Sequence, residues 1–243
     1  MKVSEILKKN EVTISCEIFP PKQGAQLQNY KAIAAEIAKL KPAYISCTYG
    51  ATGGTSDYTV EIADAINSYG VPAIAHLTCV SSTREKVHTV IHELKERGIE
   101  NILALRGDIP TNTDFPLPDQ YHHAIELIRE IREAGDFCIG GACYPEGHPE
   151  SKNIVADIEN LKRKADAGAS QLVTQLFLDN DYFYSFLYIG KCFFYSSSYF
   201  SVLFIHYRKK FSRTHLIQIL CFRISFFGHK IFKHIVSLSI LYY

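Results

Sequence analysis

The sequence predicts an α/β fold, in the form of a (β/α)8 barrel of the TIM type that is truncated after its sixth βα unit. From residue 12 to about residue 176, short apolar runs alternate with amphipathic stretches, as they do in repeated βα units around a parallel sheet. Polar residues gather where the apolar runs end, which is where barrel enzymes place their active sites. The doubly wound alternative lacks its GxGxxG fingerprint, because the glycine-rich stretch 49–54 has a different spacing.

Six strands are predicted, each as a short run rich in apolar residues. They are Val12–Phe19, Ala43–Thr48, Ala73–Thr78, Ile102–Leu105, Phe137–Ala142 and Gln171–Phe177. Helices are predicted between them near 26–40, 56–69, 82–97, 119–133 and 151–167. A full barrel takes roughly 250 residues, and no seventh or eighth strand of this pattern follows. We therefore expect two parts, a partial barrel over 1–186 and an atypical tail over 187–243.

Local signals mark where these helices begin and end. Gly70, Gly98, Gly135 and Gly168 each follow a predicted helix, and glycine accommodates the left-handed backbone that ends many helices. The stretch 82–85, Ser-Thr-Arg-Glu, supplies capping residues ahead of the third helix. These signals support the βα units independently of the apolar pattern.

The bulk composition is that of a domain from a reducing compartment. At 243 residues the chain can bury a core without disulfide or metal staples. The formal net charge of +1 gives no field that would favour nucleic acid as a partner. The 7 cysteines form no CxxC pair and no metal-like spacing with histidine, so neither a disulfide framework nor a metal site is expected. The first residues, MKVSEILKKNEV, lack the apolar segment of a signal peptide, and we expect a cytoplasmic protein.

The composition changes sharply after Asp181. All 25 acidic residues lie at or before Asp181. From Tyr182 to Tyr243 the chain has 8 Lys or Arg, 4 His and 19 Phe or Tyr, but no Asp, Glu, Ala or Pro. Surfaces of globular domains mix both signs of charge, and their helices use Ala freely. The tail therefore has a different origin or a different environment from the rest of the chain.

Glu17 is the first candidate catalytic residue. It lies within ISCEIFPP, residues 14–21, as a carboxylate embedded in an apolar strand. A carboxyl group buried there would keep its proton closer to neutral pH than an exposed one, which suits a general acid. The alternative is a solvent-facing Glu at a strand edge with no such role.

Further polar side chains stand at the ends of the next strands. The second strand ends in Thr48-Tyr49-Gly50, the third contains His76, and the fourth leads into Arg106-Gly107-Asp108. An Arg and an Asp separated by one Gly offer a cation and a carboxylate to a polar cofactor, and the Gly permits close approach. Taken singly, each has an ordinary explanation, since a lone His is usually structural and Arg-Gly-Asp often marks only a loop.

The fifth and sixth strands add a second set of polar residues. Strand five leads into Tyr144-Pro145-Glu146-Gly147-His148-Pro149. The helix after it carries Asp157, Asn160 and Lys164, whose i, i+3, i+7 spacing places them on one face. For the helix alone, a solvated polar face is the simpler explanation. Gln175 ends the sixth strand and can both donate and accept hydrogen bonds there.

Together, these segments resemble the methylenetetrahydrofolate reductase family. The matching segments, in order, are Glu-Ile-Phe-Pro-Pro (17–21), Thr-Tyr-Gly-Ala (48–51), His-Leu-Thr-Cys (76–79), Arg-Gly-Asp (106–108), Tyr-Pro-Glu-Gly-His-Pro (144–149), Asn-Leu-Lys-Arg-Lys-x-Asp-Ala-Gly-Ala (160–169) and Thr-Gln-Leu-Phe (174–177). The resemblance covers about residues 1–186 and includes nearly every strand end. One departure is Tyr121-His122-His123, where the family more often has a small residue after the Tyr.

The resemblance implies a flavoenzyme of one-carbon metabolism. Members of the family are barrels that hold FAD at the carboxyl ends of their strands and reduce 5,10-methylenetetrahydrofolate to 5-methyltetrahydrofolate, feeding methionine synthesis. The implied electron donor is NADH or NADPH, between which this sequence does not distinguish. The resemblance further implies a folate substrate and is compatible with a homo-oligomer.

The family's site residues carry over position by position. Those that match FAD-binding positions are Thr48, His76, Arg106, Gly107, Asp108, Tyr144, His148, Asp157, Asn160 and Lys164. Glu17 matches the acid that protonates the folate as its five-membered ring opens, and Asp108 matches the carboxylate that tunes flavin reactivity. Gln175 matches a residue that touches the reacting partner. Glu17 and Asp108 are thus the implied catalytic residues, and Glu17 and Gln175 the implied substrate contacts.

The resemblance ends after Ser185-Phe186-Leu187. The family continues with two more βα units, whereas this chain continues with YIGKCFFY and does not return to the pattern. One hypothesis is a frameshift, because an AT-rich gene read in the wrong frame would give such a composition. Another is a membrane anchor over Leu187–Tyr207, followed by Arg208-Lys209-Lys210, although the serines at 196–198 argue against it. A third is a FAD-binding remnant without turnover.

The tail also decides whether the sheet has open edges. Its segments Tyr199–Tyr207 and Leu216–Phe222 have a β-prone composition. The absence of acidic residues and Ala argues that the tail was not selected to complete the barrel. We therefore expect two open parallel edges, low solubility and poor catalysis.

Overall fold

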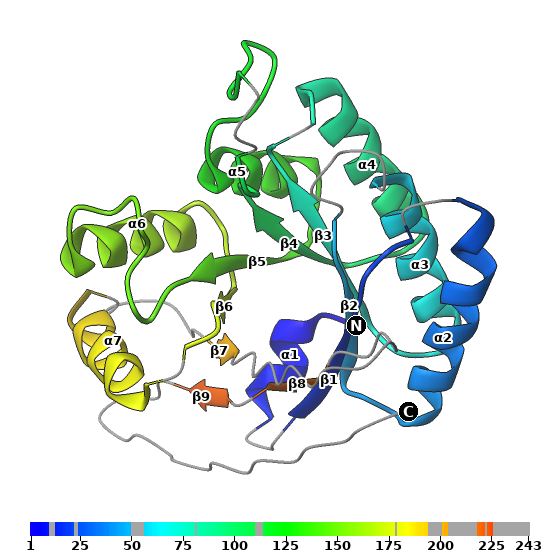
Figure 1. The fold of residues 1–243 in the computed structure, drawn as a ribbon, viewed down its shortest axis with the longest axis horizontal. Coiled ribbons are helices and arrows are strands. Elements are labelled where there is room, and N and C mark those ends of the chain that lie inside the picture. The colour runs from blue at the N-terminus through cyan, green and yellow to red at the C-terminus, as the bar shows by residue number, and fades with distance from the viewer. Residues whose placement is uncertain are drawn as a thin grey trace.

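Six parallel strands form the centre of the computed structural model, which describes residues 1–9, 13–21, 24–49, 56–80, 82–109, 114–177, 179–193, 201–203, 218–221 and 223–225 (Figure 1). These strands are β1 (Thr13–Ile18), β2 (Tyr44–Cys47), β3 (Ala73–Thr78), β4 (Asn101–Leu105), β5 (Cys138–Cys143) and β6 (Gln171–Thr174). Each coincides with a strand predicted from the sequence, although β6 ends three residues earlier than predicted. The α/β class and the six βα units are confirmed.

The helices alternate with these strands. They are α1 (Val3–Lys8), α2 (Leu27–Lys39) with the short 3-10 helix η1 (Gly24–Gln26) before it, α3 (Ser56–Ser68), α4 (Arg84–Glu96), α5 (Ala124–Ala134), α6 (Ile154–Asp166) and α7 (Asn180–Phe193). Helices α2 to α6 confirm the five predicted ones. Thr83 caps α4 as predicted, because its side chain accepts a hydrogen bond from the Lys86 N–H at 3.1 Å. The glycines after α3, α4 and α6 have positive φ, whereas Gly135 after α5 is extended and differs from the prediction.

The hydrophobic core lies between the sheet and the outer helices. Each of β1 to β6 pairs in parallel with its neighbour in chain order, and α2 to α7 lie along the outer side of the sheet (Figure 1). Residues such as Ile45, Ile62, Leu94, Ile102 and Leu127 are fully buried between them. Burying one such side chain contributes about 1.5–3 kcal/mol. Because the strands are parallel, their carboxyl ends lie at one edge of the sheet.

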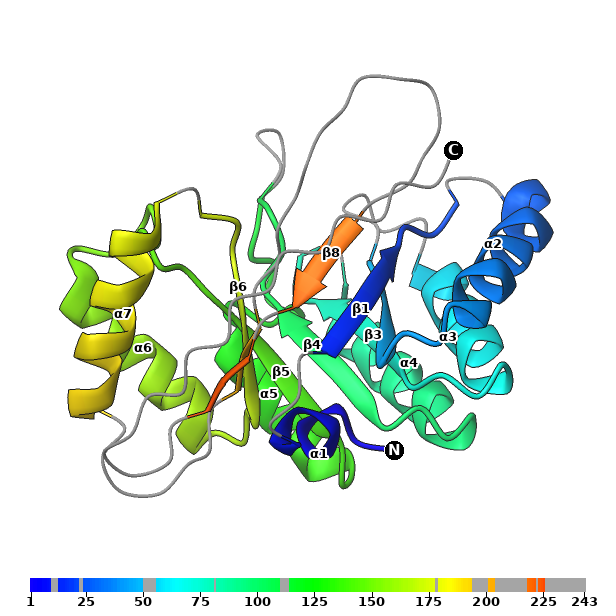
Figure 2. The same ribbon diagram turned by 90° about the horizontal axis from the view of Figure 1, so that it is seen from below.

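Helix α1 covers the opposite edge. Its Val3 and Leu7 pack against Tyr44, Ile74, Leu103, Cys138 and Val173 on five successive strands, below the sheet in Figure 2. Asn101 ties the helix to β4, since its Oδ1 accepts from the Val3 N–H at 2.7 Å. The amino ends of the strands are thereby covered with apolar side chains, and the carboxyl ends remain as the place for polar groups.

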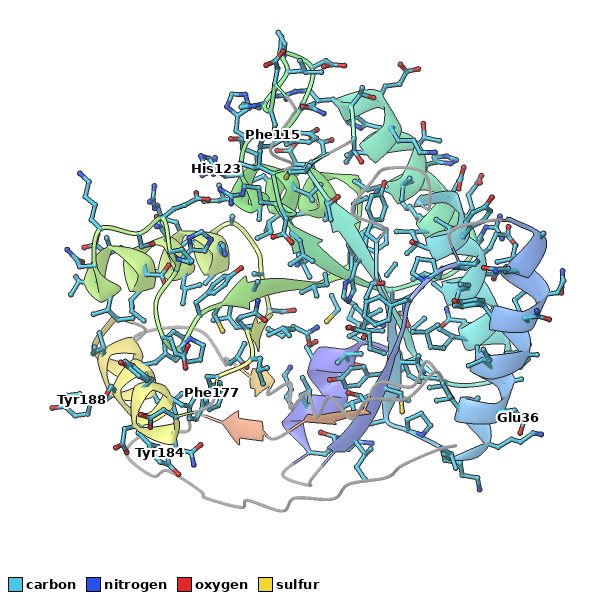
Figure 3. All side chains as sticks on the ribbon, viewed as in Figure 1. Glu36, Phe115, His123, Phe177, Tyr184 and Tyr188 are labelled. Atoms are coloured by element: carbon cyan, nitrogen blue, oxygen red, sulfur yellow. The ribbon has the colours of Figure 1, made fainter. Side chains whose placement is uncertain are left out.

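Helix α7 packs against the rest of the fold, although the resemblance described above ends within it, near residue 186. Phe183, Phe186 and Leu187 are buried against α6 and β6, and Phe177 stacks on Phe183 with ring centroids 5.1 Å apart. Tyr188 points away from the core and is 72% exposed (Figure 3). The predicted anchor over 187–207 begins in this helix, and part of it lies outside the described residues. Among the helices that the structure describes, none is long and apolar enough to cross a membrane.

Three short strands from the tail extend the sheet at both edges. β7 (Ser201–Leu203) pairs in parallel with β6, β8 (Gln218–Cys221) pairs antiparallel with β1, and β9 (Arg223–Ser225) pairs antiparallel with β7. The nine-stranded order is β8-β1-β2-β3-β4-β5-β6-β7-β9, and Figure 2 shows β8 beside β1 in the opposite direction. The prediction of open edges at β1 and β6 is therefore wrong, and a seventh parallel strand follows the sixth unit. Strands β7 and β8 lie within the two stretches whose composition is β-prone, whereas β9 lies just after the second.

Candidate active site

The residues predicted from strand ends gather at the carboxyl edge of the sheet. Glu17 lies in β1, Thr48 follows β2, His76 lies in β3, Arg106 to Asp108 follow β4, Tyr144 follows β5 and Gln175 follows β6. This arrangement follows from the parallel pairing of six consecutive strands. It brings side chains together that are separated by up to 158 residues in the sequence, from 17 to 175. Two groups of contacts can be distinguished among them.

The first group surrounds the Glu17 carboxyl group. Its Oε2 accepts a hydrogen bond from Ser46 Oγ at 2.9 Å, and His76 Nε2 lies 3.5 Å from the same oxygen. The Glu17 side chain is 13% exposed and that of His76 9%. The alternative of a solvent-facing Glu at a strand edge is therefore wrong. A carboxyl group between a hydroxyl and an imidazole can hold or release a proton at a fixed place.

Burial sets the charge of the groups around Glu17. It lowers the pKa of His76, and the neighbouring Glu17 carboxylate only partly opposes this effect. His76 is therefore neutral near pH 7, and its Nε2 has no hydrogen-bond partner among the described residues. Burial, followed by the repulsion from Glu17, raises the pKa of Cys47 well above the range of a reactive thiol.

The second group begins at the turn after β4. Arg106 donates two hydrogen bonds to the Glu150 carboxylate, at 2.6 and 2.7 Å. Asp108 is exposed two residues later. Gly107 between them has a φ of +86°, and a Cβ there would lie 3.2 Å from the Val80 Cβ. The turn therefore requires glycine, and it presents a cation and a carboxylate side by side.

The loop after β5 adds two rings and a buried carboxylate. The rings of Tyr144 and His148 meet edge to face with centroids 4.7 Å apart. Asp157 on α6 accepts hydrogen bonds from the His148 N–H at 3.0 Å and from Ser151 Oγ at 3.1 Å. His148 Nδ1 accepts from the Glu150 N–H at 3.1 Å, so its proton is on Nε2 when the ring is neutral. Burial, and after it the nearby Asp108, raises the pKa of Tyr144.

Lys164 lies on α6, two turns after Asp157, and belongs to the second group of contacts. Its Nζ donates to the Ala142 carbonyl at the end of β5, at 2.8 Å. Burial lowers its pKa, while Cys143 and Asp157 act in the opposite direction. Burial also raises the pKa of Cys143 to about 12. The face of α6 that carries Asp157 and Lys164 thus points inward. The alternative that this face is solvated is wrong for these two residues.

Three other candidates occupy the margin of the site. The half-buried Asn160 accepts a hydrogen bond from Arg163 through its side-chain oxygen. Gln175 is exposed, and its Oε1 accepts from the Leu176 N–H at 2.9 Å. The Thr48 carbonyl accepts from Thr59 Oγ1 at 3.0 Å. These contacts leave the polar atoms of Gln175 near the surface, where a substrate can reach them.

Sequence reasoning missed Ser46, Glu150 and Ser151. Ser46 lies directly opposite Glu17 in the parallel register of β1 and β2, so a correct alignment of the two strands would have found it. Glu150 and Ser151 follow the predicted Tyr144–Pro149 segment, but their partners, Arg106 and Asp157, lie 44 and 6 residues away. Within the described ranges, no group of three His, Cys, Asp or Glu side chains is arranged to hold a metal ion.

Comparison with known proteins connects this geometry to a family. The family model for methylenetetrahydrofolate reductase matches residues 2–196. The chain is 39% identical over 172 residues to the 5,10-methylenetetrahydrofolate reductases of Salmonella typhimurium and of Escherichia coli, covering 70% of this chain and 57% of each relative. It is 37% identical over 201 residues to methylenetetrahydrofolate reductase 2 of Schizosaccharomyces pombe, covering 76% of this chain and 31% of that protein. The chain thus spans a little over half the length of its bacterial relatives.

Solved structures support the fold. One similar structure is that of an uncharacterized protein from Clostridium thermocellum that binds two copies of 5-methyl-5,6,7,8-tetrahydrofolic acid, with a TM-score of 0.61 and 15% identity over 84% of this chain and 69% of that one. Another is 2,3-dimethylmalate lyase, with a TM-score of 0.53 and 11% identity over 82% of this chain and 68% of that one. The fold is shared at these low identities, whereas the match of sequence covers nearly every strand end of the site. The chain belongs to the methylenetetrahydrofolate reductase family.

Proposed function

We propose that this chain binds FAD along the carboxyl edge of its sheet and carries the site that reduces 5,10-methylenetetrahydrofolate to 5-methyltetrahydrofolate. The observation that carries the proposal is the Glu17 carboxyl group, 13% exposed and held by Ser46 beside a neutral His76, at the same edge as Arg106 and Lys164. A proton donor and a set of cations at one edge suit a reaction in which a substrate is protonated while an anionic cofactor is bound.

The residues present fit FAD. The turn at Gly107, whose positive φ and contact with Val80 leave no room for a side chain, places Arg106 and Asp108 on either side of it at the carboxyl edge. Arg106 and Lys164 are cations suited to the pyrophosphate, and His148 Nε2, Tyr144 and Thr48 supply hydrogen-bond donors around it. His76, Asp108, Asp157 and Asn160 complete the proposed set. When bound, FAD would supply the two-electron chemistry that connects a nicotinamide donor with the folate.

Glu17 supplies the proton for the folate step. Opening of the five-membered ring of 5,10-methylenetetrahydrofolate leaves a nitrogen that must be protonated, and a carboxylic acid at a fixed place can protonate it. Asp108 is the exposed carboxylate of the same edge and would favour the cationic folate species by Coulomb attraction. Gln175, with a polar amide near the surface, would contact the substrate.

Family membership supports the remaining parts of the proposal. The relatives are named for reduction of methylenetetrahydrofolate, and a structural neighbour binds a methylated tetrahydrofolate. We extend this to a folate substrate, NADH or NADPH as the donor, a role in methionine synthesis and a cytoplasmic location. A non-catalytic FAD-binding remnant is the second candidate, since the residues after 196 lie outside the family match.

The two candidates are separated by spectroscopy and turnover. The purified chain is mixed with FAD, passed through a desalting column and examined by visible absorption. Retained flavin absorbance supports the site, and its absence in a folded sample contradicts it. Formation of 5-methyltetrahydrofolate from NADH or NADPH then separates an enzyme from a remnant.

A further inference from the structure

We propose that Ser46 is a positioning residue, which holds Glu17 Oε2 as a hydrogen-bond acceptor so that the transferable proton is carried by Oε1. The inference rests on the proposed function only in assuming that the Glu17 proton is transferred to the folate. The hydrogen bond between Ser46 and Glu17 is present in the chain without any ligand. Ser46 Oγ donates to Glu17 Oε2 at 2.9 Å, and the two residues face each other in the parallel register of β1 and β2.

The geometry makes this contact directional. Ser46 is 8% exposed, and its strand is buried at every residue, so water is a poor competitor for the Ser46 hydroxyl. His76 Nε2 lies 3.5 Å from the same oxygen. The Ser46 hydroxyl is therefore the hydrogen-bond donor to Oε2, whereas His76 Nε2 makes no hydrogen bond within the described residues. A carboxylic acid carries its proton on one oxygen, and a donor directed at Oε2 favours the form in which that oxygen remains an acceptor.

The surroundings of Glu17 limit which groups can alter its titration. Two titratable side chains near Glu17 are His76 in β3 and Cys47 in β2, and the Glu17 carboxylate raises the pKa of both. Burial keeps His76 neutral near pH 7, and it keeps Cys47 protonated. On the other side of β1, β8 pairs with residues 13–16 and stops before Glu17. The Ser46 hydroxyl is a neutral group, so its removal takes away a hydrogen bond to the Glu17 carboxyl group without changing any nearby charge.

The test is a pH titration of the Glu17 carboxyl carbon by NMR in the full 243-residue chain labelled with ¹³C-glutamate, without cofactor. The resonance is identified by its loss in Glu17→Gln. A hydroxyl that donates to the carboxylate stabilises the charged form, so Ser46→Ala should move the titration midpoint upward by roughly 0.5–1 pH unit. Ser46→Thr keeps the hydroxyl and should restore the midpoint. Ser46→Cys, which is nearly isosteric but a weak donor, should shift it as Ser46→Ala does and replaces that variant if it does not fold.

Ser170→Ala is the matched control. Ser170 also has a partly buried hydroxyl that donates to a backbone carbonyl, but it lies at the amino end of β6. The midpoint of Glu17 should not move in this variant. An unchanged midpoint in folded Ser46→Ala or Ser46→Cys overturns the proposal, and so does an equal shift in Ser46→Thr, which would point to packing rather than to the hydroxyl. FAD binding measured on the same variants reports on the proposed function separately.

Discussion

The guanidinium of Arg106 and the carboxylate of Glu150 form a bidentate pair, with hydrogen bonds of 2.6 and 2.7 Å. The hydrogen bonds raise the pKa of Arg106 and lower the pKa of Glu150. The side chain of Arg106 is 22% exposed and that of Glu150 60%, so water screens the pair from one side. Because Arg106 is also a proposed ligand of FAD, Glu150 and a cofactor phosphate would compete for the same cation.

Replacement of Glu150 by Gln should therefore tighten FAD binding. The amide cannot neutralise Arg106, and the guanidinium becomes available to the pyrophosphate, so we expect the Kd to fall about threefold to tenfold. Titration of FAD fluorescence measures the change, and Glu159→Gln, on the exposed side of α6, is the control for loss of a surface charge. Weaker binding in Glu150→Gln would mean that Glu150 instead holds Arg106 in its binding position.

Replacement of Gly107 by Ala should destabilise the chain more than replacement of Gly70 by Ala. Both glycines have positive φ, +86° and +80°, but a Cβ at 107 meets the Val80 Cβ at 3.2 Å, whereas a Cβ at 70 meets nothing within 4 Å. The backbone term common to both is about 1 kcal/mol, and the close contact adds about 1–2 kcal/mol at 107. Urea denaturation of the two variants measures the difference in the free energy of unfolding. Equal losses of stability would show that the Val80 side chain moves aside.

His76 should make the chain sensitive to mild acid. Its pKa in the folded chain lies below the ordinary histidine value of about 6.5, because burial disfavours the imidazolium. The unfolded chain therefore takes up this proton first, so the stabilising contribution is present above pH of about 6.5 and is lost as the pH falls toward the lower folded value. Denaturation midpoints between pH 7.5 and 5 should fall less steeply in His76→Asn than in the parent chain. Parallel curves would contradict the lowered pKa.

The sequence predicted the regular part of the fold because burial leaves a readable pattern. The strands β2 and β3 are buried at every residue, so they appear as short runs in which most residues are apolar. Helix α1 was missed because six residues give too little periodicity. Helix α7 was missed although its buried Phe183, Phe186 and Leu187 follow helical spacing, because the aromatic residues beside them, Tyr182, Tyr184 and Tyr188, obscure that spacing. Pairing of β8 with β1 joins two segments near opposite ends of the chain, which no local pattern encodes.

The sequence placed the candidate residues at the carboxyl edge of the sheet but left their contacts open. Helical spacing placed Asp157 and Lys164 on one face, but a polar face indicates solvent as readily as an inward site, and only the structure shows it turned inward. The hydrogen bond between Ser46 and Glu17 depends on strand register, and the pairing of Arg106 with Glu150 joins two loops. Such relations are set by how the strands are aligned, so the sequence identified residue types and left their partners open.

Replacement of Glu17 by Gln should separate the two half-reactions of the proposed enzyme. Reduction of bound flavin by the nicotinamide needs no proton from Glu17 and should change by no more than about twofold, whereas transfer to the folate should slow by about 10²–10⁴-fold. Stopped-flow absorbance at the flavin band follows both steps. Glu36→Gln, on the outer helix α2 (Figure 3), is the control that should leave both rates unchanged. Equal losses in the two steps would mean that Glu17 is structural.

The tail should limit turnover even though the site residues are present. The family match ends at residue 196, so the strands β7, β8 and β9 come from sequence outside it. β8 and β9 run antiparallel to their neighbours β1 and β7, and their carboxyl ends therefore point to the edge opposite the site. Of the three tail strands, only β7 ends at the edge where Glu17 and Arg106 lie. The part of the substrate site that two further parallel βα units would contribute is thus not rebuilt by the strands that replace them.

We therefore expect this chain to form 5-methyltetrahydrofolate at least about 100-fold more slowly than the Escherichia coli relative at equal bound flavin, a loss of about 2.7 kcal/mol in transition-state stabilisation. Product is measured under saturating NADH and NADPH in turn, and the thermal melt of each sample is recorded to show that the protein is folded. The loss should appear in the folate step, because the proposed FAD ligands lie within the matched residues 2–196, whereas the substrate site lacks the part that two further βα units would contribute. A sharp melt together with a rate within about tenfold of the relative would contradict this prediction and show that the tail completes a working substrate site.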